Sequence, residues 1–130
     1  MRTCTSSRVL WITLIAYWTF LTALLLTPNP WQLLGSFPAP LKRSLETSLT
    51  DYVQHFLSFS LLGTLAWSAR RAAAWATWVP FLCSLLTYAI AIELLQMAIP
   101  DRTFQWHDLF ANTMGLLGGW AFPAVCLRQK

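Results

Sequence analysis

The chain has 130 residues, of which 56% are hydrophobic and 11% are charged, and its formal net charge at pH 7 is +4. A soluble domain this small cannot bury so large an apolar share, so the composition excludes an ordinary soluble domain and indicates a lipid bilayer as the solvent. Basic residues do not alternate with aromatics in any run, so no nucleic-acid partner is expected.

Four segments are long and apolar enough to cross a bilayer, which takes about 20 mostly apolar residues per helix. They cover residues 9–27, 53–69, 77–99 and 108–127 and form one domain over residues 1–130. None shows the period-two alternation of a membrane β-strand. The predicted fold is therefore all-α, an integral membrane bundle of four transmembrane helices.

The first segment follows the tail "MRTCTSSR", and a short basic tail before an apolar run is also typical of a signal peptide. The run is longer than the usual apolar core of a signal peptide, and no small-x-small cleavage site follows it. We therefore expect this helix to be retained in the protein.

The connection over residues 28–50 contains "TPNPW" and "FPAP", and these prolines exclude a continuous helix. In "LKRSLETSL", Leu41, Leu45 and Leu49 recur every four residues, which favours a short amphipathic segment on the membrane surface. Two interpretations stay open, because this segment either covers a polar pocket or lies passively at the interface.

The distribution of Lys and Arg predicts the orientation of the bundle. Six of the nine basic residues lie in the two terminal tails and the second connection, which share one side of a four-helix topology: Arg2, Arg8, Arg70, Arg71, Arg128 and Lys130. The positive-inside rule then places both termini in the cytoplasm and the first and third connections outside.

Polar residues that orientation does not explain collect at the outward ends of the predicted helices. They are Asp51, His55, Glu93, Gln96, Arg102, Asp108 and Asn112. An ionisable side chain within a membrane span is costly, so its presence points to a function. We predict that these seven residues form a ligand-binding site.

Helical spacing supports this prediction. The acid and the imidazole of the second segment are four residues apart, and the two polar residues of the third are three apart, so each pair shares a helix face. In the fourth segment, Asp108 and Asn112 begin a stripe that continues through Gly115 and Gly119. Small residues let a neighbouring helix approach closely, so the polar residues on this stripe are expected to face the bundle interior.

Glu93 requires a partner to remain in the span, and His55 or Arg102 is expected to supply it, with Asn112 and Gln96 completing the cluster. Such a pocket suits the head group of a membrane lipid or another cell-envelope component. An anionic or lipid-linked envelope molecule is one expected partner, with Arg102 holding the anion, because guanidinium binds oxyanions well.

Three alternatives compete with a binding site. The first is that Asp51 and Asp108 are N-terminal caps, with His55 and Glu93 as structural contacts between helices. The second is a purely structural or assembly subunit. A membrane-embedded acid/base enzyme acting on a lipid-linked precursor is the third. However, the sequence contains neither His-Glu-x-x-His nor Gly-x-Ser-x-Gly. We therefore expect binding rather than catalysis, and no metal or other cofactor.

The spaced polar positions resemble the VanZ-like membrane proteins. The resemblance rests on Asp51-x-x-x-His55, "ELLQ" at 93–96, Arg102, and "DLFANTMG" at 108–115. It implies a multi-pass protein of the bacterial cytoplasmic membrane with a role in the cell envelope. The founding member of that family is linked to resistance to the glycopeptide teicoplanin, which implies a glycopeptide-resistance-related context without implying that this chain confers resistance.

Overall fold

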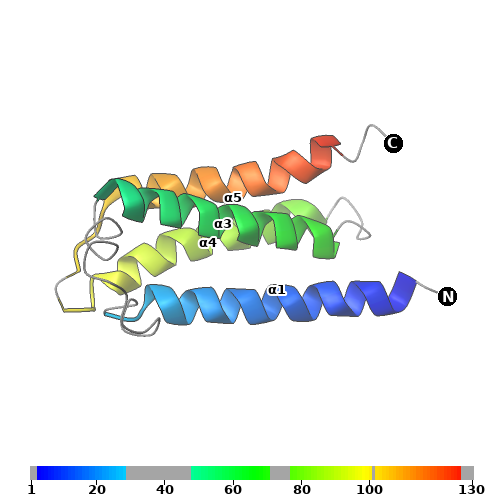
Figure 1. Ribbon diagram of the computed structural model, residues 1–130, viewed down its shortest axis with the longest axis horizontal. Coiled ribbons are helices and arrows are strands. Elements are labelled where there is room, and N and C mark those ends of the chain that lie inside the picture. The colour runs from blue at the N-terminus through cyan, green and yellow to red at the C-terminus, as the bar shows by residue number, and fades with distance from the viewer. Residues whose placement is uncertain (1–2, 29–47, 71–76, 101, 127–130) are drawn as a thin grey trace, which may run out of the picture.

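The computed structural model describes residues 3–28, 48–70, 77–100 and 102–126. Its helices are α1 (Thr3–Leu25), α3 (Ser48–Arg70), α4 (Trp78–Gln96) and α5 (Trp106–Cys126). No strand occurs among the described residues, so the all-α prediction is confirmed. Figure 1 shows that α1 and α4 run in one direction and α3 and α5 in the other.

Helices α1, α3 and α5 begin earlier than predicted, because each extends into the polar residues before its apolar run, whereas α4 begins at Trp78, one residue later than predicted. α3 begins at Ser48, which places Asp51 in the first turn of the helix. α5 begins at Trp106, and the carbonyl of Gln105 accepts hydrogen bonds of 3.2 Å from the backbone N–H groups of both Asp108 and Leu109. Neither acid is therefore an N-terminal cap, and that alternative is wrong for both.

α4 ends at Gln96, three residues earlier than predicted. The N–H groups of Met97, Ala98 and Ile99 bond to carbonyls three residues back, so the chain tightens into a turn before Pro100. Proline has no N–H and cannot continue an α-helix, which explains why the helix ends here. Pro80, by contrast, lies in the first turn of α4, where a missing N–H costs nothing.

Helices α3 and α5 pack side by side through glycine, and this is the most extensive contact in the bundle. A Cβ atom at Gly115 would overlap the Phe56 carbonyl, and one at Gly119 would overlap the Ser60 carbonyl. From the other helix, a Cβ atom on Gly63 would lie 2.9 Å from the backbone nitrogen of Trp120. The predicted close approach at Gly115 and Gly119 is confirmed, and Gly63 completes the seam.

The seam also accommodates a proline inside α5. Pro123 lacks the N–H that would bond to the Gly119 carbonyl one turn earlier. The Thr64 hydroxyl of α3 lies 3.1 Å from that carbonyl and 2.9 Å from the carbonyl of Ser60. A neighbouring helix thus supplies the donor that the proline removed, as membrane bundles commonly require.

Helix α1 is joined to the bundle by buried leucines and by side-chain hydrogen bonds. The Tyr17 hydroxyl donates to the Ser58 carbonyl of α3 at 2.9 Å. The hydroxyls of Thr22 and Tyr88 lie 2.9 Å apart and connect α1 to α4. These contacts make α1 an integral part of the fold, although its retention in the cell stays a prediction.

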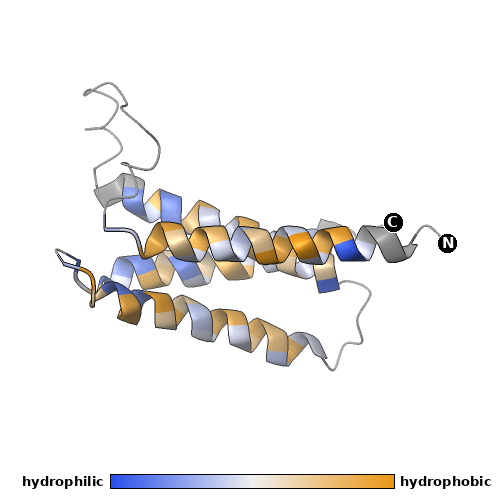
Figure 2. Ribbon diagram, turned by 90° about the horizontal axis from the view of Figure 1, so that it is seen from below, coloured by the Kyte–Doolittle hydropathy of each residue, from blue (hydrophilic) through white to orange (hydrophobic). Residues whose placement is uncertain are grey.

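Apolar side chains fill the centre of the bundle and also cover much of its outside. Figure 2 shows apolar residues along the helices and the hydrophilic residues gathered mainly near the helix ends. Among the described residues, two helical stretches are long and apolar enough to cross a membrane, Ser7–Leu25 and Trp78–Gln96. Helices α3 and α5 are not among these stretches. Four membrane crossings therefore remain a proposal.

Aromatic side chains hold the end of the bundle that carries the chain termini. Trp78 packs edge to face against Trp67 and Trp120, with ring centroids 6.3 and 5.8 Å apart. The guanidinium of Arg70 lies 4.6 Å from the centre of the Phe81 ring and donates a 3.0 Å hydrogen bond to the Thr77 carbonyl. These contacts fix α3, α4 and α5 together at this end.

Candidate functional site

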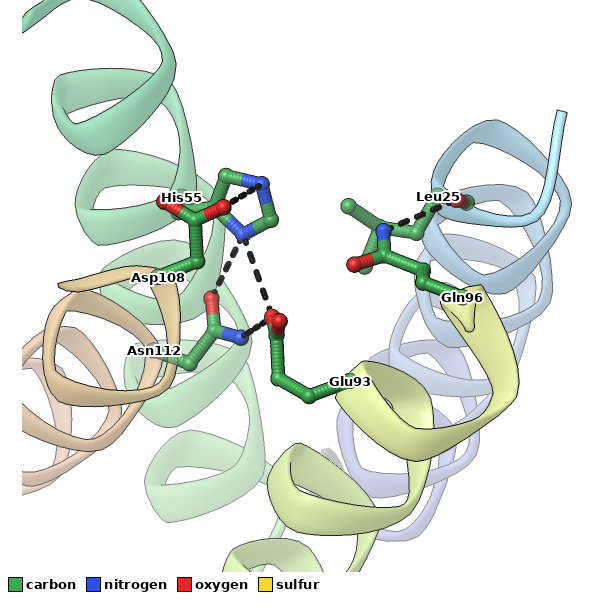
Figure 3. A network of polar contacts seen from close by, with 6 residues as sticks. All are labelled: Leu25, His55, Glu93, Gln96, Asp108 and Asn112. Carbon is green, nitrogen blue, oxygen red and sulfur yellow. Dashed lines mark hydrogen bonds and ion pairs between the residues drawn. The ribbon is translucent and has the colours of Figure 1, made fainter. Parts of the chain in front are cut away.

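Four polar side chains from three helices meet at the opposite end of the bundle (Figure 3). His55 comes from α3, Glu93 from α4, and Asp108 and Asn112 from α5, and all four are buried. We call these four residues the polar cluster. The predicted convergence of His55, Glu93, Asp108 and Asn112 therefore occurs, whereas ligand binding by them stays a prediction.

Asn112 is the centre of the polar cluster. Its amide nitrogen donates a 2.7 Å hydrogen bond to Oε1 of Glu93, and its carbonyl oxygen lies 2.9 Å from Nδ1 of His55. An amide carbonyl only accepts, so Nδ1 of His55 must be the protonated donor. Nδ1 also lies 3.8 Å from Oε1 of Glu93, and the Asn112 amide thus links an acid and an imidazole.

The second ring nitrogen of His55 points toward Asp108. Nε2 of His55 lies 3.9 Å from Oδ2 of Asp108, which is longer than a hydrogen bond. The spacing of four residues between Asp108 and Asn112 places both on one face of α5, so successive turns of this helix reach the two ring nitrogens (Figure 3).

Gln96 is buried but belongs to a different contact. Its side-chain nitrogen donates a 2.9 Å hydrogen bond to the backbone carbonyl of Leu25 at the end of α1. The last carbonyls of a helix have no partner within the helix, so Gln96 satisfies one of them. The expectation that Gln96 would complete the hydrogen bonds around Asn112 is therefore wrong, and its role is to tie α1 to α4.

Asp51 and Arg102 lie at the rim of the polar cluster. Asp51 is exposed, Arg102 is half-buried, and among the described residues neither side chain makes a hydrogen bond or ion pair. The predicted ion pair between Arg102 and Glu93 is thus not formed. Arg102 nevertheless interacts electrostatically with both Asp51 and Glu93, so its positive charge stabilises the charged forms of these two acids.

The electrostatics of Asp51 reflect this rim position, before the apolar run that begins at Val53. Partial desolvation of its carboxyl group raises the pKa of Asp51 above its ordinary value of 3.8, and the carboxylate of Asp108 raises it further. His55 and Arg102 act in the opposite direction. Asp51 therefore shares the electrostatic field of the cluster without touching it.

Sequence reasoning missed two contacts of the bundle, one at each end. A backbone carbonyl, that of Leu25, has no signature in sequence, so the partner of Gln96 was not foreseeable. Gly63, in contrast, is the single glycine of α3, and a glycine in a span was a usable signal for close helix packing.

The chemistry available at the cluster is hydrogen bonding and acid/base exchange. Among the described residues, no three side chains of His, Cys, Asp and Glu are arranged to hold a metal ion. The second imidazole, His107, is exposed beside Trp106 and does not join the cluster.

A family model described as VanZ/LLP1 matches residues 9–127, which include every member of the polar cluster. The chain belongs to the VanZ/LLP1 family. The predicted resemblance to VanZ-like proteins is thereby confirmed. Comparisons with curated proteins and with solved structures gave no match. Family membership and the two apolar helices are compatible with a membrane protein.

Proposed function

We propose that this VanZ/LLP1 protein binds the polar head group of a membrane lipid or lipid-linked envelope component at the polar cluster. One observation carries the proposal: three helices bury an imidazole, an amide and two carboxyl groups at one end of a bundle whose sides are apolar. Burying such groups is costly without a compensating role. A ligand with an acyl or isoprenoid tail would place that tail beside the apolar helices and its head group at the helix ends.

The proposal includes four membrane crossings in the bacterial cytoplasmic membrane, with both termini in the cytoplasm. The start of α1 and the end of α5 lie at the same end of the bundle as the end of α3, which is Arg70 (Figure 1). The polar cluster lies toward the other end, because Asp108 is in the first turn of α5 and Glu93 is near the end of α4. The excess of Lys and Arg at the terminal end supports a cytoplasmic location for it. The polar cluster would then face outward, toward the cell envelope.

Arg102 gives the proposed site a place for an anion. It lies at the rim, half-buried, with no hydrogen bond or ion pair from its side chain to other described residues. A guanidinium at the membrane surface would hold a phosphate well, because arginine forms paired, charge-assisted hydrogen bonds to oxyanions. Lys42 and Arg43, predicted on the same side, lie outside the described residues.

Native mass spectrometry of protein extracted with its lipids tests the proposal. We expect a specific lipid to remain bound, and the Glu93→Gln variant to retain at least about tenfold less of it, which corresponds to about 1.4 kcal/mol. Glutamine keeps the shape of Glu93 but removes the carboxylate that orients Asn112.

The matched control is His107→Gln, which changes an exposed polar residue at the same end of the bundle. This variant should retain the lipid as the unsubstituted protein does. If Glu93→Gln folds normally and keeps its full lipid complement, the polar cluster is only a structural contact between helices and the proposed function fails.

A further inference from the structure

The two ring nitrogens of His55 have different surroundings, and this difference identifies the side of the polar cluster that a ligand can reach. Nδ1 faces Asn112 and Glu93, whose exposed fractions are 0% and 1%, so that side is closed. Nε2 faces Asp108, which is 9% exposed and lies in the first turn of α5, nearer the helix end. A ligand that enters from the helix ends would therefore meet Nε2 and Asp108 first.

The chain from Glu93 through Asn112 fixes the proton on His55. Because the Asn112 amide donates to Glu93, its carbonyl must face Nδ1, and Nδ1 must carry a proton. Glu93 and Asn112 are thus positioning residues for the imidazole. They leave Nε2 free to present either a lone pair or a second proton toward Asp108.

The distance between Nε2 and Oδ2 of Asp108 is suited to one shared oxygen atom. The two atoms are 3.9 Å apart, so an oxygen can lie about 2.8 Å from both, at ordinary hydrogen-bond length. When Nε2 of His55 and the Asp108 carboxyl group carry one proton between them, one of the two donates a hydrogen bond and the other accepts one. A hydroxyl group matches both, since it accepts one hydrogen bond and donates another.

We propose that His55 Nε2 and Asp108 Oδ2 together bind a hydroxyl group of a polyol or sugar head group. This inference rests on the proposed function and names the chemistry of its ligand. A phosphate at the same position would face the carboxylate of Asp108, and that of Asp51 nearby, so the pair disfavours an anion. Arg102 at the rim is the better place for a phosphate of the same head group.

Nuclear magnetic resonance of the full chain tests the inference directly. The chain has two histidines, so His107→Gln in protein free of a histidine tag leaves His55 as the single imidazole. Nitrogen-15 labelling then reports both ring nitrogens in nanodiscs of stated composition. We expect Nδ1 to be protonated in every lipid, and Asn112→Leu to abolish this preference. An unprotonated Nδ1 in the otherwise unsubstituted chain would overturn the inference.

The lipid comparison separates a hydroxyl ligand from an anionic one. Dioleoylphosphatidylglycerol and dioleoylphosphatidylmethanol carry the same phosphodiester charge, but only the first has hydroxyl groups. Relative to phosphatidylcholine, phosphatidylglycerol should shift the Nε2 resonance by several parts per million, and phosphatidylmethanol should not. Asp108→Leu should abolish the shift, because leucine removes one of the two groups that hold the hydroxyl.

Each remaining outcome distinguishes the inference from the proposed function. An equal shift with phosphatidylmethanol overturns the hydroxyl inference and leaves lipid binding standing. A shift caused by free glycerol in phosphatidylcholine, but not by phosphatidylglycerol, supports the hydroxyl chemistry and overturns a lipid source. No shift under any condition overturns the hydroxyl inference, whereas the proposed function is decided separately by the lipid retained in native mass spectrometry.

Discussion

At one end of the bundle Asn112 joins α3, α4 and α5 through directional hydrogen bonds, whereas at the other end Trp78 and Trp120 pack beside a glycine seam. The aromatic end needs only close packing and buried apolar area, and neither depends on which atoms carry protons. The polar end needs each donor to find its acceptor, because an unpaired polar group in an apolar interior costs about 1–3 kcal/mol. The same helices are thus held by close fit at one end and by hydrogen-bond pairing at the other.

The seam toward the aromatic end should show the largest effect on stability. Gly119→Leu places a side chain against the Ser60 backbone, so α3 and α5 must separate. We expect a loss of about 3 kcal/mol or more, seen as a large drop in folded yield in detergent.

Gly118 provides the matched control, because nothing lies within 4 Å of a Cβ atom built there. Gly118→Leu should fold as well as the unsubstituted chain or slightly better, since glycine is a poor helix former. Equal yields for the two leucine variants would contradict the role of the seam.

Removal of the central amide should produce the largest effect at the polar end. Asn112→Leu leaves Nδ1 of His55 and Oε1 of Glu93 without their partner inside the bundle. We expect a loss of about 2–4 kcal/mol in the free energy of unfolding, measured by denaturant titration in detergent. Thr113→Val, at the next position of α5, should change stability by less than about 0.5 kcal/mol. A similar cost for both would show that pairing is not what holds this end.

A smaller effect is expected where the seam meets Pro123. Thr64→Val removes the hydroxyl that approaches the Gly119 carbonyl and should cost about 1 kcal/mol. In a Pro123→Ala background, the restored N–H can bond to that carbonyl, so the same change should cost less. A double-mutant cycle measures this coupling, and strict additivity would contradict the compensation.

The smallest effect concerns the rim of the polar cluster. Because the pKa of Asp51 is raised in the folded state, folding favours its protonated form, and the stability from this group is lost as pH rises from 3.8 through the folded pKa. Asp51→Asn should therefore be slightly more stable than the unsubstituted chain at pH 7, by about 1–3 °C in thermal midpoint. Below pH 3.8 the advantage should disappear. If the two thermal midpoints differ by the same amount at pH 7 and below pH 3.8, the effect does not come from the charge of Asp51.

Part of the polar end was predictable because helical spacing is a local property of sequence. The four-residue interval between Asp108 and Asn112 places them on one face wherever the helix lies. Which residue bonds to which was not predictable: Gln96 points to Leu25 and not to Asn112, and Arg102 does not pair with Glu93. Such pairings depend on the rotation of neighbouring helices, which no single helix specifies.

By itself, the sequence determined the helical class, the approximate extent of each helix, the family resemblance and the set of polar residues at one level of the bundle. These follow from apolar length, proline positions and periodicity, all of which act within a segment. Only the tertiary structure decided that Asn112 bridges Glu93 and His55, that Thr64 compensates for Pro123, and that Nε2 of His55 faces Asp108. Those contacts join residues as far as 57 positions apart, and their geometry is set by how closely the glycines let α3 and α5 approach.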